Sequence, residues 1–126
     1  MLKQEFKYHI MRKKIKYKSK KGSKVEILDS TYEHRRAKIL DASPKVISWT
    51  KNHGIRIPYK SGRKIRHYIP DFLIVMSDGR HIIEETKGYI WDPIKHGKKH
   101  LAARIYCASK GWEYHILFNL DIEIEP

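Results

Sequence analysis

Residues 68–88 of the 126-residue chain read YIPDFLIVMSDGRHIIEETKG, and this stretch predicts the centre of the fold. Phe72–Met76 is an unbroken apolar run, Asp78-Gly79 is a two-residue turn signal, and apolar residues resume at positions 82–83. Two apolar runs on either side of an Asp-Gly pair are typical of a β-hairpin. The stretch therefore predicts two buried antiparallel strands.

Charged residues stand at the ends of these strands, where buried strands rarely place them. Glu85 and Lys87 share a face because side chains alternate along a strand, and the hairpin brings Asp71 near the end of that face. Carboxylates are ligands that magnesium prefers, and the backbone carbonyl of Thr86 is a further candidate. Lys87 is then placed to orient an attacking water or to offset charge on phosphorus. Each fragment alone also fits an ordinary strand start or a surface ion pair, but the combination favours a metal site.

The ordered set of Pro70-Asp71, a hairpin and Glu85-Thr86-Lys87 resembles the PD-(D/E)XK nuclease signature. The resemblance runs from Ser30 to Phe118 and includes these flanking residues: Ile57-Pro58-Tyr59, Arg66-His67-Tyr68, Gly88 and Trp91. It implies an α/β fold with a restriction-endonuclease-like αβββαβ core, a central mixed sheet flanked by helices, and DNA cleavage with a divalent metal. Three groups fit equally: TnsA-type transposon-end endonucleases, phage head-completion nucleases and phage junction-resolving endonucleases.

Glu33 has two interpretations. The spacing from Ser30 to Glu33 is that of a capping box, in which the glutamate side chain reaches back to the Ser30 amide. The resemblance instead places here the helical glutamate that completes the metal site in many of these nucleases. Glu33 shares a helical face with Ala37 and Leu40, which turns it inward and favours the catalytic role.

The formal net charge of +13 is concentrated at the N-terminus, where residues 1–24 hold ten Lys and Arg against one acid. Such a basic segment suits a polyanion, since neutralised phosphates release counterions. We therefore divide the chain into a basic arm over residues 1–24 and a nuclease domain over residues 25–126. The alternatives for the arm are a solubility tail, or a segment whose apolar residues pack on the domain.

Further basic residues are candidates for phosphate contacts within the folded domain. Those in the predicted turn over residues 60–64 precede the strand that delivers Asp71, and others begin the second helix. The alternative is an ordinary basic turn and a solvated first helical turn. With three lysines of the arm, the predicted DNA-binding residues are Lys13, Lys14, Lys16, Arg56, Lys60, Arg63, Lys64, Arg66, Lys98 and Lys99.

The remaining elements follow from hydrophobic spacing and from turn residues. Helices are predicted over residues 30–41 and 98–109, the first burying Tyr32, Ile39 and Leu40, and strands over residues 46–49, 54–59 and 112–118. Gly97 is expected to delay the second helix. Residues 121–125 alternate acid and isoleucine, which predicts an edge strand at a dimer contact or an acidic flap near the basic arm.

The composition narrows the other possibilities. The single Cys107 fits a reducing compartment, and no apolar run approaches the length of a membrane span. No phosphate-binding glycine loop is present, so we expect no nucleotide cofactor. The protein is expected to be soluble and intracellular, in a bacterial or phage-infected cell.

These observations predict a magnesium-dependent DNA endonuclease in which manganese substitutes for magnesium. Asp71, Glu85, Lys87 and Glu33 form the predicted catalytic set, and cleavage leaves a 5′-phosphate, as the resemblance implies. A preference for branched DNA, with a homodimer making two symmetric cuts, is the first expectation for substrate. The alternatives are a head-completion or transposon-end nuclease working with partners, or a DNA-binding module without catalysis.

Overall fold

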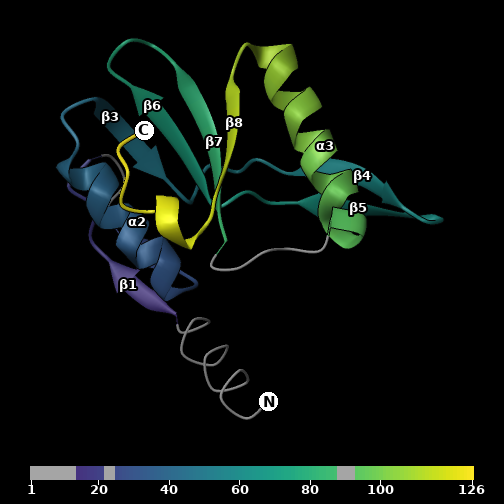
Figure 1. Cartoon of the computed structure of the whole chain (residues 1–126), viewed down its shortest axis with the longest axis horizontal. Coiled ribbons are helices and arrows are strands. Elements are labelled where there is room, and N and C mark those ends of the chain that lie inside the picture. The colour runs from purple at the N-terminus through teal and green to yellow at the C-terminus, as the bar shows by residue number, and fades with distance from the viewer. Residues whose placement is uncertain (1–13, 22–24, 88–92) are drawn as a thin grey trace.

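A computed structural model describes residues 14–21, 25–87 and 93–126 of the chain. Its centre is a four-stranded sheet in the order β3-β6-β7-β8 (Figure 1). The strands are β3 (Val46–Thr50), β6 (Phe72–Met76), β7 (His81–Thr86) and β8 (Glu113–Leu117). Pairing is antiparallel between β3, β6 and β7 and parallel between β7 and β8, so the sheet is mixed as predicted.

The β6–β7 hairpin confirms the prediction from residues 68–88. Phe72 lies opposite Glu84 and Val75 opposite His81, and Gly79 forms the turn with a φ of 92°. That φ lies in the left-handed region, which favours glycine. The alternating side chains of the hairpin reach both faces of the sheet, so each face needs its own cover.

Helix α2 (Thr31–Ala42) covers one face (Figure 1). Ala37 and Leu40 pack there with Trp49, Phe72 and Ile74, all buried. The predicted stripe was wrong in part, because Tyr32 and Ile39 are only half-buried while two charged residues of the helix, Glu33 and Arg36, are buried.

Buried charge on α2 has a partner on the sheet. The guanidinium of Arg36 donates to both carboxylate oxygens of Glu84, at 2.6 and 2.9 Å, and both side chains are almost fully buried. The prediction of the buried face of α2 used apolar residues alone. It was wrong in part because this face also holds Arg36, which is buried with its partner Glu84.

Helix α3 (Pro93–Lys110) and a second hairpin lie over the other face (Figure 1). That hairpin joins β4 (Ile57–Ser61) to β5 (Lys64–Tyr68) and is inserted between β3 and β6. Ala103 and Cys107 of the helix pack with Ile57, Tyr68 and Ile83. Without the inserted hairpin, the order α2, β3, β6, β7, α3, β8 is the expected αβββαβ core.

Two boundaries on this face differ from the predictions. The helix starts at Pro93 and continues through Gly97, because one glycine costs only about 1 kcal/mol and packing against β4 outweighs it. The predicted turn over residues 60–64 is shorter, since β4 extends to Ser61 and β5 begins at Lys64. Gly62, with a φ of 63°, makes the reversal possible in so few residues.

Part of the predicted arm contacts the domain. Strand β1 (Ile15–Tyr17) pairs antiparallel with β2 (Glu26–Leu28), and Ile15 and Tyr17 pack against the core beneath α2. The Tyr17 hydroxyl donates to Asp41 at 2.8 Å. Residues 1–13 and 22–24 of the arm, including Lys13, lie outside the described residues.

The predicted edge strand over residues 121–125 was wrong. The chain forms a short 3-10 helix, η1 (Asn119–Asp121), and then a turn that buries Ile122. Arg36 donates to the carbonyl oxygens of Ile122 and Ile124, at 2.8 and 2.5 Å, which uses acceptors that a strand ladder would need. The segment therefore offers no strand edge for a dimer.

In the parts of the chain that the structure describes, no helix is both long and apolar enough to cross a membrane.

Candidate active site

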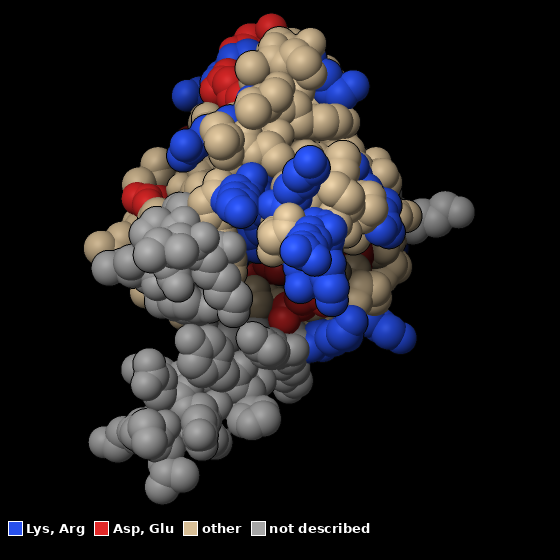
Figure 2. Space-filling model, turned by 90° about the vertical axis from the view of Figure 1, so that its right-hand side faces the viewer, with Lys and Arg blue, Asp and Glu red and all other residues tan. Residues whose placement is uncertain are grey.

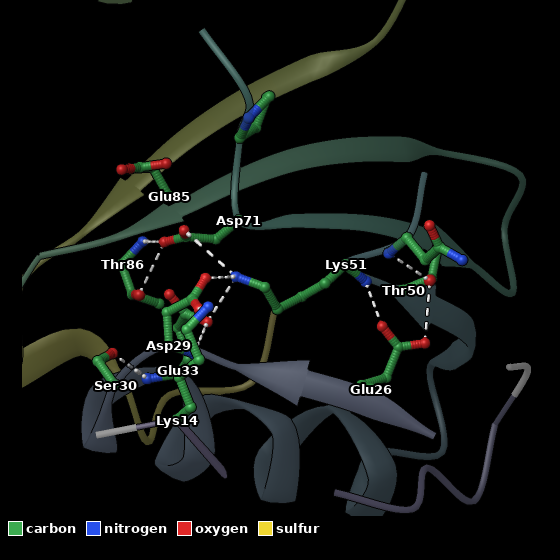
Figure 3. Close-up of polar contacts among 12 residues, drawn as sticks. Lys14, Glu26, Asp29, Ser30, Glu33, Thr50, Lys51, Asp71, Glu85 and Thr86 are labelled. Atoms are coloured by element: carbon green, nitrogen blue, oxygen red, sulfur yellow. Dashed lines mark hydrogen bonds and ion pairs between the residues drawn. The ribbon is translucent and has the colours of Figure 1, made fainter. Parts of the chain in front are cut away.

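The ends of β6 and β7 bring the predicted acids together. Asp71 directly precedes β6, and its Oδ2 accepts from the backbone amide and the hydroxyl of Thr86, at 2.8 and 2.9 Å (Figure 3). These bonds fix the Asp71 carboxylate beside the last residue of β7. The convergence follows directly from the register of the hairpin.

Glu85 and Lys87 lie on one side, as their spacing requires. Lys87 Nζ is 3.4 Å from Glu85 Oε2, and the side chains are 16% and 9% exposed. The Lys87 amide donates to the Leu117 carbonyl of β8 at 2.6 Å, which holds the backbone at this position. A buried carboxylate and a nearly buried ammonium therefore share the end of the strand.

Two tyrosines that sequence reasoning did not assign support Glu85. The Tyr68 hydroxyl donates to Glu85 Oε1 at 2.7 Å and is 2.9 Å from the Tyr114 hydroxyl. The Tyr114 hydroxyl in turn lies 2.5 Å from His100 Nδ1. Burial, together with the charge of Glu85, raises the pKa of Tyr68 far above its ordinary value, so Tyr68 remains a donor. These residues come from β5, β8 and α3, and no local pattern links them.

Glu33 enters the same site from α2. The Ser30 hydroxyl accepts from the Glu33 amide at 3.1 Å, which caps the helix. The Glu33 side chain accepts from the Asp29 amide at 2.9 Å, one residue before the partner that a capping box uses. The same carboxylate is 2.6 Å from Lys51 Nζ. Glu33 therefore both stabilises the N-terminus of α2 and faces the candidate site.

Lys51 is a charged residue in this site that the sequence analysis also missed. It follows β3 directly, and its ammonium lies 2.6 Å from Glu33, 3.2 Å from Asp29 and 3.8 Å from Asp71 (Figure 3). Nothing near it in the sequence marks a site. The only signal was that β3 is antiparallel to β6, which places the end of β3 beside the start of β6.

The pKa values of the charged groups in the cluster are shifted by burial and by the charges of their neighbours. Burial, and next the charge of Asp71, raise the pKa of Glu33 to about 7. The same two causes raise the pKa of Glu85 to about 7. Burial opposes the charge on Lys51, but Asp71 and Glu33 raise its pKa above the ordinary value. Burial and the charge of Asp71 therefore both disfavour the ionised forms of Glu33 and Glu85.

Basic side chains gather over the hollow that contains the acids. On the face formed by α3 and the β4–β5 hairpin, Lys and Arg border a recess with acidic atoms at its bottom (Figure 2). Lys99 Nζ lies 5.2 Å from the centre of the Tyr68 ring, next to Glu85. The exposed predicted residues in these elements and the loop before them are Arg56, Lys60, Arg63, Lys64, Arg66 and Lys98.

The described lysines of the arm also lie on the surface. Lys14 and Lys16 flank Ile15 on β1 and are exposed. Lys14 Nζ is 3.6 Å from Asp29, whose side chain is 54% exposed at the outer edge of the acidic cluster. Lys14, directly before β1, therefore lies at the outer edge of the same site.

A comparison with protein families identifies the fold. The family of TnsA-like endonuclease N-terminal domains matches residues 43–119, more than half of the chain. The chain belongs to this family. Asp71, Glu85, Thr86 and Lys87 lie within the match, whereas Glu33 precedes it. No curated protein matches the chain.

The TnsA-like domain presents a donor set that fits a divalent metal ion. Glu33 on α2 and Glu85 on β7 are buried, and Asp71 directly precedes β6. After burial, the charge of Asp71 is the next cause of the raised pKa of both glutamates, and a divalent cation would offset this charge. Within the described residues, no three acids, imidazoles or thiols are close enough to hold an ion as they stand. Lys51 lies between two of the acids.

The raised pKa of Glu85 gives the TnsA-like domain a pH-dependent stability. A carboxyl group with a raised folded pKa stabilises the fold below its unfolded pKa of 4.5, and that contribution is lost as the pH rises through about 7. Gln mimics the protonated form of the glutamate. The free energy of unfolding of Glu85→Gln should therefore equal that of the wild type at about pH 5 and be larger by roughly 2–3 kcal/mol at about pH 8. Urea denaturation in EDTA measures both.

The comparison between variants removes the effect of other titrating groups. Glu125→Gln is the matched control, because Glu125 is exposed, and it should follow the wild type at both pH values. A Glu85→Gln protein that is less stable than the wild type at about pH 8 would contradict the prediction.

Proposed function

We propose that the protein is a DNA endonuclease that depends on a divalent metal ion. The observation that carries the proposal is the convergence of Asp71, Glu85 and Lys87 at one end of the sheet, in a chain that belongs to an endonuclease family. Carboxylates at this position would repel phosphate in a protein that only bound DNA. The retained acids therefore favour catalysis over a silent binding module.

Each residue has a role that its contacts support. Asp71 and Glu85 would hold the ion, with Glu33 and the backbone carbonyl of Thr86 as further ligands. When bound, magnesium or manganese supplies positive charge that activates water and stabilises charge on the phosphate. Tyr68 keeps the Glu85 carboxylate oriented through its 2.7 Å hydrogen bond.

Lys87 is placed for work on the reacting phosphate. Its ammonium lies 3.4 Å from Glu85 and remains partly exposed, so it can reach a water or a phosphate oxygen at the mouth of the site. Attack of water on phosphorus, with the 3′ oxygen as the leaving group, would leave a 5′-phosphate and a 3′-hydroxyl, as the family resemblance implies. The basic residues around the recess would hold the phosphates on either side of the scissile bond.

Two classes of DNA substrate are proposed. The TnsA-like match favours a transposon-end nuclease that works with partner proteins. Branched DNA is the second candidate, because the basic residues around the recess suit phosphate contacts, which position DNA without reading its bases. A homodimer is the arrangement that two symmetric cuts would require.

The test is incubation of the purified protein with labelled linear duplex, single strand, flap and four-way junction. We expect metal-dependent cuts bearing 5′-phosphates in magnesium or manganese, and none in EDTA. Paired nicks near a branch point would assign the junction class, whereas equal cutting of plain duplex, or cleavage only after a partner protein is added, would assign the transposon-end class. Intact DNA in every metal, with and without added partner protein and despite binding by fluorescence anisotropy, would overturn the proposal in favour of a binding module.

A further inference from the structure

Lys51 is anchored so that its side chain must enter the acidic cluster. Its backbone amide donates to Glu26 Oε1 at 2.7 Å, and the Thr50 hydroxyl donates to the other oxygen of the same carboxylate at 3.0 Å. Glu26 is itself buried in β2. The main chain at the end of β3 is therefore held from behind, and the Lys51 side chain is only 14% exposed.

The Lys51 ammonium is shared among three carboxylates from three different segments. Glu33 lies on α2, Asp71 precedes β6, and Asp29 joins β2 to α2 (Figure 3). The closest of the three is Glu33 at 2.6 Å. Two of these carboxylates, Glu33 and Asp71, belong to the donor set that the proposed function assigns to the metal.

A buried ammonium and a divalent ion repel each other strongly when they share ligands. At the short distances of this cluster, the repulsion between the two cations is much larger than in water, because little solvent screens it. The present Lys51 contacts therefore oppose metal binding to Glu33 and Asp71. Asp29 is more than half exposed and offers the ammonium a position farther from the buried acids.

We propose that Lys51 is the internal counterion of Glu33 and Asp71 in the metal-free enzyme, and that a divalent cation binds by displacing its ammonium. The proposal rests on the proposed function in one respect, the assignment of these two acids to the metal. Lys51 is then a positioning residue with two effects. It lowers the affinity for metal, and it holds the Glu33 and Asp71 carboxylates close together when no metal is bound.

Calcium titration by isothermal calorimetry tests the displacement with a readout other than cleavage. Lys51→Met removes the charge but keeps the length of the chain, so calcium should bind about tenfold more tightly than to the wild type. Lys45→Met is the matched control, because Lys45 is exposed and precedes the opposite end of β3, and its affinity should stay within about twofold of the wild type. Unchanged or weaker binding by Lys51→Met would overturn the role of Lys51.

A further variant separates this proposal from the proposed function. Asp71→Asn should lose calcium binding whether or not Lys51 is present. If Asp71→Asn binds calcium like the wild type, the metal site of the proposed function is wrong. If Asp71→Asn loses calcium binding while Lys51→Met binds calcium like the wild type, the metal site stands and only the role of Lys51 is wrong.

Lysine labelling of the wild-type protein keeps the test independent of any folding defect in the variants. With acetic anhydride and mass spectrometry, Lys51 should be modified slowly in EDTA and several times faster in calcium, because displacement exposes its amine. Lys45 should be modified at the same rate in both conditions. An unchanged rate at Lys51 in saturating calcium would overturn the proposal.

Discussion

Replacing Glu85 with Gln is expected to slow DNA cleavage by about a thousandfold. The amide keeps the size of the side chain and can still accept from Tyr68, which bonds Glu85 Oε1 at 2.7 Å. It removes the charge that a divalent ion needs and the partner of Lys87, 3.4 Å away. Single-turnover cleavage of a labelled substrate in magnesium measures the loss.

DNA binding should survive this substitution, because removing an acid from a phosphate-binding surface reduces repulsion. Fluorescence anisotropy in calcium measures binding without cleavage. Glu125→Gln, at an exposed position, is the matched control and should cleave like the wild type. Near-normal cleavage by Glu85→Gln would remove Glu85 from the active site and leave the family assignment intact.

Replacing Arg36 with Met is expected to destabilise the fold by about 3–5 kcal/mol. The substitution leaves Glu84 fully buried without its bidentate partner. It also removes two donors from carbonyl oxygens of the C-terminal segment, at Ile122 and Ile124. Urea denaturation monitored by circular dichroism measures the change in unfolding free energy.

The neighbouring arginine supplies the control for this prediction. Arg35 pairs with Glu123, but the two side chains are 36% and 53% exposed, so Arg35→Met should cost at most about 1 kcal/mol. Similar losses for the two variants would show that burial of the Arg36–Glu84 pair has little effect on stability. A native-like Arg36→Met protein would also mean that the C-terminal turn does not need this anchor.

The two predictions describe different uses of adjacent acids on one strand. Glu84 faces α2 and is balanced by Arg36, whereas Glu85 faces the opposite side and lies beside Lys87. Alternation along β7 sends these consecutive residues to opposite faces of the sheet. One acid therefore holds the fold together, while its neighbour is available for chemistry.

Hairpin chemistry explains what the sequence by itself determined. The apolar runs, the Asp-Gly turn and the alternation of β7 are local, so the sequence predicted β6, β7 and the approach of Asp71 to the end of the partner strand. The caps and periodic apolar residues likewise predicted α2, and most of α3. The same local order of Asp71, Glu85 and Lys87 carried the family resemblance.

Only the tertiary structure decided which distant charges meet. Lys51 follows a different strand from the acids it contacts, and Arg36 finds Glu84 across the interface between helix and sheet. Residues 121–125, predicted as a strand, form a turn because Arg36 donates hydrogen bonds to two carbonyl oxygens of this segment. Such contacts join residues far apart in the sequence, and their free energy depends on burial. A local pattern of side chains shows neither which distant residues meet nor how deeply they are buried. The fold therefore had to be known before these charges could be paired.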